Sequence, residues 1–340
     1  MDSGHPSALP VIPLIDLGPA GLDELARRMP DRVRMLVGAA NKLLPGPVLD
    51  FMDVRSRAWL ARNETPYRAE IDAVAAIPGV RGAHGLNLST EWACTAATAD
   101  GRLVRTLDWP IRGLGGAITV VRQESPAGHW FNVTWPGFIG VLTGMAPGRF
   151  AIAYNQAPIR WATGLWPIDW VIERMRVNRR RALPATHLIR RVFETARDFH
   201  AAFALLRETP IAYTGLISIA GAHGEAAIIE RAEHLAFVHA GPGAIPNQWL
   251  NTEWRGHPRG IDSPGRLAQC RMLTHDLRRL DGTDLAWLAY PMLNKLSRLL
   301  VIADLKTGDL AVVGLEPEGK TAAPATMPFA MNVHAEERPR

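Results

Sequence analysis

The strongest constraint on the fold is a change of pattern near residue 85. Before it, apolar residues recur at spacings of three and four, as in an amphipathic helix, until Pro45 and Pro47 interrupt them. A second helical stretch is predicted at Val48 to Ala61 and a short helix before Pro78, followed by an apolar and polar alternation at Gly85 to Thr90. The first quarter is therefore predicted to be largely helical. Its first run consists of Leu22, Leu25, Met29, Val33, Leu36, Val37 and Ala40.

From Cys94 onward the pattern is mainly that of strands. Residues 94–109 predict two strands joined at Asp100 and Gly101, a pair suited to a type I′ hairpin turn. Helices are predicted at Trp166 to Arg181 and Pro184 to Arg207. Strands, helices and strands again indicate stacked sheet and helix layers. The other strand predictions are GAITVVRQE, HWFNVTW, FAIAYNQ, the run IAYTGLISIAGAHGEAAIIERAEHLAFVHA with a turn at residues 221–224, and the pair LLVIADLKTGDLAVVGL.

Composition narrows the function classes. With 47% hydrophobic residues among 340, the chain can bury a large core. The net charge of +5 is small for this length, and its densest part, RMRVNRRR at residues 174–181, has helical periodicity; we expect a solvated helix face, with a surface for an anionic partner as the alternative, and no nucleic-acid partner. The histidines lack metal-ligand spacing and no phosphate-binding loop occurs, so we expect no metal and no cofactor. Without a secretory or membrane-spanning pattern, and rich in Ala and Arg, the protein is expected to be cytoplasmic and bacterial.

The two cysteines have to be interpreted separately. Two are too few for a disulfide framework, so Cys94 and Cys270 are each either packing or chemistry. A thiol attacks an amide as a thiolate or with its proton taken by a base, and a free α-amino group on the same residue can be that base. An internal Cys94 has no such amine until the Ala93–Cys94 bond is broken.

Four segments resemble one family in the same order. Residues 66–109, ending in EWACTAATADGRLVRTLDW, resemble the cleavage junction of the acid ceramidase and N-acylethanolamine acid amidase family, relatives of the bile salt hydrolases. GFIGVLTGMAPGRFAIAYNQ resembles the family segment ending in Asn-Glu-Arg, LNTEWRGHPRGIDSPGR its Thr-Asn-Tyr-Asp segment, and PMLNKLSRLLVIADLKTGDL its C-terminal strand pair. Together they cover most of residues 66–310.

The resemblance implies a role for each matched residue. Cys94 would cleave the bond before it by an N-to-S acyl shift and would then be the N-terminal nucleophile. In the matched Arg-x-x-Asp motif, Asp108 would orient the new amine and Arg105 would favour the thiolate. Because a spacing of three puts two residues on opposite faces of a strand, we expect a strand end or bulge to turn one of them inward.

The remaining matched residues concern the oxyanion and the far side of the site. Asn251 matches the asparagine that donates to the oxyanion, and Asn155 is a matched neighbour of Gln156. Gln156 departs from the family, since ceramidases have glutamate and bile salt hydrolases asparagine there. Arg266 matches a second arginine, while Cys270 matches nothing. Asn251 and Gln156 could also be turn residues, and Arg266 a solvated side chain.

The resemblance also implies an architecture and an activity. We expect an α+β protein with the four-layer αββα sandwich of N-terminal nucleophile hydrolases at residues 94–340, after a helical segment, residues 1–93, that stays associated as a separate chain after cleavage. The expected activity is hydrolysis of an N-acyl lipid amide through a thioester, with peripheral contact to membranes or lipid aggregates. Two alternatives stay open, an acyltransferase of the penicillin acyltransferase type and a lipid-binding relative that never cleaves itself.

Tryptophan is abundant between the predicted nucleophile strand and the central helices. The aromatic walls of these residues could line an acyl channel or pack in the core. The cluster consists of Trp109, Trp130, Trp135, Trp161, Trp166 and Trp170.

Overall fold

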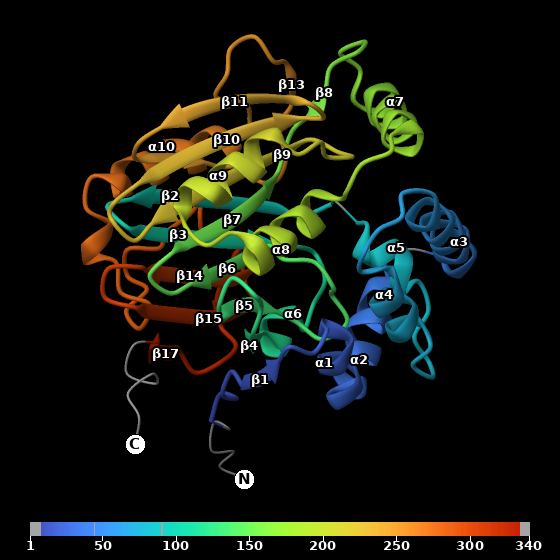
Figure 1. The fold of residues 1–340 in the computed structure, drawn as a ribbon, viewed down its shortest axis with the longest axis horizontal. Helices are drawn as coiled ribbons and strands as arrows, with labels where there is room; N and C mark the ends of the chain where they lie inside the picture. Colours follow the sequence, from blue (N-terminus) through green and yellow to red (C-terminus); the bar gives the residue numbers. More distant parts are fainter. Residues whose placement is uncertain (1–7, 44, 90, 334–340) are drawn as a thin grey trace.

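The protein is built from two large β-sheets packed face to face between helices (Figure 1). A computed structural model describes residues 8–43, 45–89 and 91–333. Strands β2 and β3 of one sheet lie against β7 and β9 of the other, and helices cover both outer faces. The α+β class and the αββα layering predicted from the sequence are confirmed.

The first sheet has eight strands in the order β1-β4-β5-β6-β7-β9-β10-β11. It is antiparallel apart from the parallel pair β1 and β4. Its strands are β1 (Leu14–Gly18), β4 (Thr119–Gln123), β5 (Trp130–Thr134), β6 (Thr143–Ala146), β7 (Phe150–Gln156), β9 (Gly215–Gly221), β10 (Ala226–Ala232) and β11 (Leu235–Ala240).

The second sheet has seven strands and begins with the order β12-β2-β3-β14-β15-β16, with β17 also paired to β15. A separate pair joins β8 to β13. These strands are β2 (Ala93–Ala99), β3 (Arg102–Asp108), β8 (Ile159–Arg160), β12 (Gly243–Ile245), β13 (Gly256–His257), β14 (Ser297–Asp304), β15 (Asp309–Glu318), β16 (Thr321–Pro324) and β17 (Phe329–Asn332).

Helices complete the outer layers. On the eight-stranded sheet lie α8 (Ala185–Thr195) and α9 (Phe199–Glu208), with Phe193 of α8 stacked on Trp130 at 4.9 Å between ring centroids. Helix α10 (Ser263–Thr274) lies on β2 and β12 of the other sheet. The remaining helical elements after residue 93 are α6 (Leu114–Ala117), α7 (Trp166–Arg179) and the 3-10 turn η1 (Leu277–Arg279).

The hairpin of β2 and β3 forms as the sequence predicts. Asp100 and Gly101 have φ angles of 51° and 79°, the left-handed conformation that a type I′ turn needs at both central positions. The pairing places Cys94 opposite Leu107 and Ala96 opposite Arg105. Cys94 and Arg105 therefore project from the same face of the sheet.

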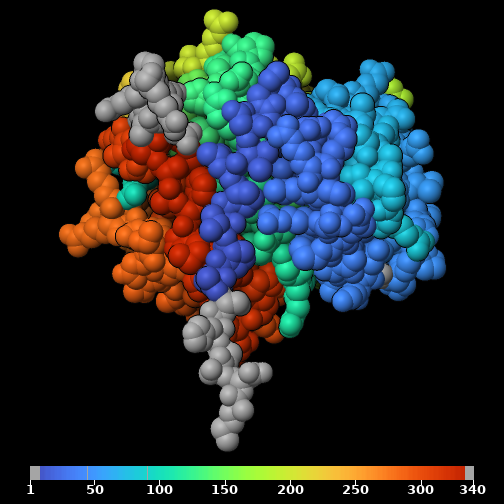
Figure 2. Space-filling model, turned by 90° about the horizontal axis from the view of Figure 1, so that it is seen from below, coloured from blue at the N-terminus to red at the C-terminus, as the bar shows by residue number. Residues whose placement is uncertain are grey.

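The N-terminal segment is helical, but it also enters the sheet. Its helices are α1 (Leu22–Arg28), α2 (Pro30–Asn41), α3 (Gly46–Arg62), α4 (Arg68–Ala75) and α5 (Ala83–Asn87), and β1 precedes them. Strand β1 was not predicted, and part of the alternation at Gly85 to Thr90 belongs to α5. Figure 2 shows this blue segment lying against both the green and the red parts of the chain.

Three further elements differ from the sequence prediction. The helix expected at residues 184–207 is divided in two, with an extended break at Ala196 and the Asp198 side chain capping α9 through the Ala201 N–H at 2.8 Å. Helix α10 was not predicted. No helix in the described part of the chain is long and apolar enough to cross a membrane.

Candidate active site around Cys94

Cys94 is fully buried as the second residue of β2, where the N-terminal helical segment enters the sandwich. Its side chain projects toward the space between the two sheets. The guanidinium of Arg105 reaches it there, with Nη2 at 3.0 Å from Sγ. The same guanidinium donates to Thr143 Oγ1 and, at 3.4 Å, to the Tyr154 carbonyl of the opposite sheet.

The thiol is held in a state that resists ionisation. Burial raises the pKa of Cys94, and Arg105, which acts in the opposite direction, only reduces that shift. An internal Cys94 is therefore mostly a neutral thiol near pH 7. It needs a base before it can turn over an amide.

The backbone N–H and carbonyl of Cys94 are both hydrogen-bonded to side chains. Its N–H donates to Asn247 Oδ1 at 2.7 Å, and its carbonyl accepts from Arg266 Nη1 at 2.6 Å. Arg266 also donates to Asn247 Oδ1 at 3.1 Å and to Thr95 Oγ1 at 3.0 Å. Asn247, in the segment after β12, was not predicted as a site residue, and its position next to Pro246 gave no signal beyond that of a loop.

Arg266 belongs to helix α10 and is fully buried. Asp262 caps that helix by accepting from the Gly265 N–H at 3.0 Å, and this fixes the first turn from which Arg266 extends. The arginine predicted from the resemblance therefore does reach Cys94. It does so from the outer helix layer, across the sheet.

Asp108 lies at the end of β3, opposite Ala93 and buried. Its carboxylate accepts from Asn294 Nδ2 and Ser297 Oγ, each at 2.8 Å. Burial raises the pKa of Asp108, against the opposing influence of Arg266 and these two donors. Asp108 and Arg105 project to opposite faces; the irregularity in pairing is on β14, between Ser297 and Leu299.

Asn155 and Gln156 end strand β7. Asn155 Nδ2 donates to the carbonyls of Ile245 and Pro246, at 2.8 and 3.2 Å, and so fixes the loop that carries Asn247. Gln156 contributes its backbone, since its carbonyl accepts from Asn247 Nδ2 at 2.7 Å. The Gln156 side chain instead meets Tyr154 OH at 3.1 Å. The departure from the family's carboxylate therefore falls on a side chain that is not bonded to Cys94.

Asn251 and Cys270 take no part in this network. Asn251 donates through its backbone to Glu230 Oε2 and accepts at Oδ1 from the Glu253 N–H, each at 2.9 Å. Its Nδ2 is buried and has no hydrogen-bond partner among the described residues. Cys270 is buried in α10, where burial raises the pKa of its thiol to about 12. The hydrogen bond to the Cys94 backbone is therefore made by Asn247, whereas the Asn251 side chain is bonded to the Glu253 N–H.

Two cavities of different character lie near the junction. One is apolar and has a volume of ≈ 40 Å³, and Trp109, Trp135 and Phe138 form part of its wall. The other has a volume of ≈ 20 Å³ and is bordered by Gln156, Arg174, Arg259 and further groups of α7. Of the other tryptophans, Trp130 is core, whereas Trp161 and Trp166 are exposed.

Among the described residues, no group of three or more His, Cys, Asp or Glu side chains could hold a metal ion.

Comparisons with known proteins give structural likenesses only. No protein-family model matches the sequence, and no curated protein matches it. A Caenorhabditis elegans ortholog of N-acylethanolamine-hydrolyzing acid amidase is 17% identical over 63% of this chain and 93% of its own, with a TM-score of 0.46.

A mutant of the conjugated bile acid hydrolase from Clostridium perfringens is 10% identical over 72% of this chain and 93% of its own, with a TM-score of 0.42. A penicillin V acylase from Agrobacterium tumefaciens is 12% identical over 71% and 86%, with a TM-score of 0.35. The first two are of the kinds that the sequence resembles. We base the function proposed below on the geometry around Cys94.

Proposed function

We propose that this protein is a self-processing amidase whose nucleophile is Cys94 after cleavage of the Ala93–Cys94 bond. The observation that carries the proposal is the set of contacts on this one residue. Arg105 lies on Sγ, Asn247 on the N–H and Arg266 on the carbonyl. Any buried backbone N–H and carbonyl need partners, but a cysteine that served packing alone would not need a buried arginine directed at its Sγ.

Processing begins with attack of Sγ on the Ala93 carbonyl carbon. The C–N bond to Cys94 breaks, the thiol proton passes to the Cys94 nitrogen, and Ala93 becomes a thioester. Water then releases Ala93 as a carboxylic acid and regenerates the thiol. Asn247 and Arg266 fix the backbone on either side of Cys94, so the thiol keeps its alignment during the shift.

Turnover uses the amine that processing creates. The α-amine takes the thiol proton while Sγ attacks the acyl carbonyl, and the leaving amine then receives that proton as the C–N bond breaks. Water releases the fatty acid from the thioester. Asp108, which pairs with Ala93 in the register, is the group proposed to orient the new ammonium group, and the second N–H of the Asn247 amide is the donor proposed for the oxyanion.

The substrate proposed is an N-acyl amide with a long apolar acyl group. We propose that the acyl half begins at the apolar cavity beside Trp109, because Trp109 directly follows Asp108 in the chain; at ≈ 40 Å³ this cavity admits a long chain only if the surrounding side chains move apart. An acyltransferase would use the same nucleophile, with a bound amine in place of water. Product ratios with and without added amine distinguish the two reactions.

The decisive experiment is intact mass spectrometry of the purified protein over several days and a range of pH. Wild type is expected to yield fragments ending at Ala93 and beginning at Cys94. Cys94→Ala stays intact, and Cys270→Ala, the matched control, is cleaved like wild type. A wild type that stays whole under all conditions contradicts the proposal and favours the lipid-binding alternative.

We also propose peripheral contact with membranes or lipid aggregates. Helices α3 and α7 expose large apolar side chains and are joined where Trp59 Nε1 donates to the Val177 carbonyl at 3.1 Å. Figure 1 shows both at the same side of the molecule. Replacing Phe51 by Ser is expected to reduce co-sedimentation with anionic liposomes, whereas Met272→Ser, on α10, leaves it unchanged. The exposed residues are Val48, Phe51, Val54, Trp166, Ile168, Val171 and Met175.

A further inference from the structure

The junction before Cys94 carries a carboxylate that is held by two arginines. Glu91 Oε2 is 3.2 Å from Arg259 Nη1, and Glu91 Oε1 pairs with Arg174 Nη2. Burial acts to raise the pKa of Glu91, but Arg259 and Arg174 outweigh it and keep the pKa below the ordinary value. A charged carboxylate, three residues before the nucleophile, therefore occupies this cationic site.

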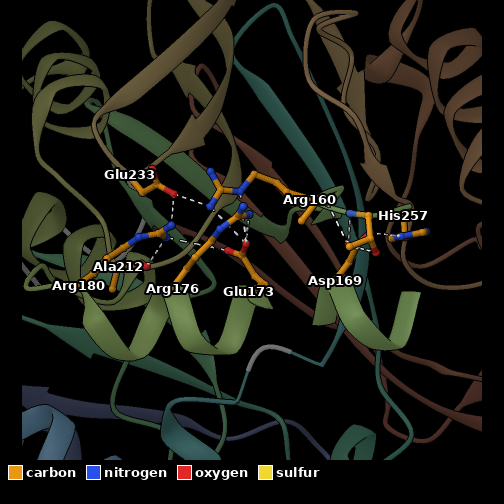
Figure 3. A network of polar contacts seen from close by, with 10 residues as sticks. Arg160, Asp169, Glu173, Arg176, Arg180, Ala212, Glu233 and His257 are labelled. Carbon is orange, nitrogen blue, oxygen red and sulfur yellow. Dashed lines mark hydrogen bonds and ion pairs between the residues drawn. The ribbon is translucent and has the colours of Figure 1, made fainter. Parts of the chain in front are cut away.

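Arg259 and the helix that carries Arg174 are held by contacts that do not involve Glu91. Arg259 Nε donates to the Ala157 carbonyl at 2.8 Å, and its backbone N–H donates to the Asn247 carbonyl at 3.1 Å. Arg174 extends from α7, which Figure 3 shows held by a network of ion pairs. In that network Glu173 of α7 and Glu233, in the turn after β10, form ion pairs with Arg160 at 3.3 and 2.5 Å.

The loop before α7 is held as firmly. Asp169 is fully buried and accepts from three successive backbone N–H groups, those of Ala162, Thr163 and Gly164, and from His257 Nε2 at 3.0 Å. Figure 3 shows this second anchor on the same helix. The position of helix α7, from which Arg174 extends, therefore does not depend on Glu91. A guanidinium carried on a helix held in this way recognises a carboxylate with less loss of entropy than one on a mobile loop.

The site formed by Arg174 and Arg259 adjoins the residues that contact Cys94, and its surroundings are polar. Arg259 and Gln156 border the same small cavity, and the Gln156 carbonyl is bonded to Asn247, the partner of the Cys94 N–H. On the other side, Trp92 is buried against Trp109, with ring centroids 5.5 Å apart. The junction peptide thus puts an aromatic group in an apolar site and a carboxylate in a cationic one.

We propose that Arg174 and Arg259 form a binding site for a carboxylate on the amine half of the substrate, so that the amides cleaved are N-acyl amino acids. This rests on the proposed amidase function. In the uncleaved chain Glu91 fills the site. Cleavage before Cys94 removes the covalent tie that keeps Glu91 there, and its half-exposed side chain can then be displaced by the substrate carboxylate.

Kinetics on the fully cleaved protein test this inference. N-lauroylglycine is expected to be hydrolysed with a kcat/KM about tenfold or more above that of N-lauroylethanolamine, which has the same acyl chain and no charge. Arg174→Gln is expected to raise KM for N-lauroylglycine about tenfold with kcat little changed, and Arg174→Lys to have a smaller effect. Glu91→Gln is expected to lower that KM. Arg179→Gln, an exposed arginine of the same helix, is the matched control and should behave as wild type.

The outcomes separate the inference from the function on which it rests. Hydrolysis of N-lauroylethanolamine without hydrolysis of N-lauroylglycine overturns the carboxylate site and leaves the amidase in place. A preference for the monoamide of a dicarboxylic acid overturns the assignment of the carboxylate to the amine half. If a cleaved protein hydrolyses none of these compounds, the proposed function fails.

A second measurement needs neither cleavage nor turnover. In Cys94→Ala/Glu91→Gln the arginines lack the carboxylate of residue 91 in an intact chain. N-acetylglycine is expected to raise the Tm of this variant more than N-acetylethanolamine does at equal concentration and ionic strength. Adding Arg174→Gln should remove the difference. Equal shifts with the two probes overturn the inference, whatever the kinetics show.

Discussion

At the scale of single residues, Cys94 is contacted by three buried side chains from different parts of the fold, and a fourth residue holds one of them. Arg105 comes from β3, Arg266 from α10 and Asn247 from the segment after β12, while the Gln156 carbonyl at the end of β7 accepts from Asn247. Each is buried, so each has lost its hydration and depends on the others for partners. Removing one of them leaves the remaining donors and acceptors unpaired.

The contact between Arg105 and the thiol gives the first prediction. Arg105→Lys keeps the charge but loses the planar fork that reaches Sγ, Thr143 and Tyr154 together. Self-cleavage is expected to slow by about 10- to 100-fold, because less thiolate is stabilised. The rate at which the Cys94 fragment appears by intact mass measures this. Arg102→Lys, on the same strand but paired with Asp304, should leave the rate unchanged, and equal slowing in both variants would contradict the assignment.

The two candidate amides can be compared directly. Asn247→Ala leaves the Cys94 N–H and one Arg266 N–H without their acceptor, at a cost of about 1–3 kcal/mol in stability, and is expected to slow cleavage at least tenfold. Asn251→Ala removes a local acceptor for the Glu253 N–H and should change the cleavage rate by less than about twofold. Cleavage rates and unfolding midpoints are measured side by side. A block by Asn251→Ala alone would restore the sequence-based assignment.

These residues show how much of the candidate site can be predicted from the sequence. The spacing of Cys94, Arg105 and Asp108 relative to the Asp100–Gly101 turn puts them in one hairpin, and the structure agrees. Asn247 was not predicted because its role depends on where a loop crosses between the sheets, which no local pattern encodes. Asn251 matched a motif, yet the amide that contacts Cys94 in the structure lies four residues earlier in the same loop.

At the scale of elements, the helices before the junction are joined by a buried histidine. His84 of α5 lies between Asp53 of α3 and Asp72 of α4, with Nδ1 and Nε2 at 3.0 and 2.8 Å from the two carboxylates. Arg57 and Arg68 face Asp72 from α3 and α4. Burial acts to lower the pKa of His84, but the two aspartates outweigh it and raise the pKa above the ordinary value.

The contact of His84 with Asp53 and Asp72, called the His84 clamp below, should be more stable in mild acid. Because the pKa of His84 is raised on folding, its stabilisation is fully present below the unfolded pKa of about 6.5 and is lost as pH rises through the folded value. Between about pH 6 and pH 9, the hydrogen exchange of residues 46–87 is expected to rise more in wild type than in His84→Gln. A pH response that is the same in both proteins would contradict the His84 clamp.

His187 of α8 does not account for a difference between wild type and His84→Gln. Burial lowers the pKa of His187 to about 3, so its effect on stability sets in only as pH falls below about 6.5, at the acid end of that window. It is also present in both proteins.

The elements that the sequence missed are those with little local signal. Strand β1 is short and sits at the sheet edge as the parallel neighbour of β4, so its hydrogen bonds depend on a partner about 100 residues away. Helix α10 has polar residues on most of its faces, and only the structure shows that its buried side carries Arg266 and Cys270. The break between α8 and α9 follows from the Asp198 cap, which competes with helix continuation.

At the scale of the whole molecule, the segment before Cys94 is part of the main core. Strand β1 extends the eight-stranded sheet, and Glu70 of α4 makes two 2.8 Å hydrogen bonds to Arg190 of α8. Tyr67 OH donates to Glu194 of the same helix at 2.6 Å. The apolar side chains that this segment adds to the core include Ile12, Leu17, Leu22, Leu25, Val33, Leu36, Val37, Leu60, Ile71 and Val74.

These contacts predict that cleavage at Cys94 does not release the N-terminal fragment. Burying one Leu, Ile or Val side chain contributes about 1.5–3 kcal/mol, so the ten residues together far exceed the few kcal/mol needed to hold two chains at micromolar concentration, even when that upper estimate is halved. Fully cleaved protein should elute as one species in size-exclusion chromatography and separate only in denaturant. Leu25→Asp, which buries a charge in this core, should cause dissociation after cleavage. Leu43→Asp, at an exposed position, should not.

Two separate peaks from cleaved wild type would mean that the fragment is a removable propeptide. The proposed active site would then have to keep its shape without the wall that Trp92 and the α2 side chains supply.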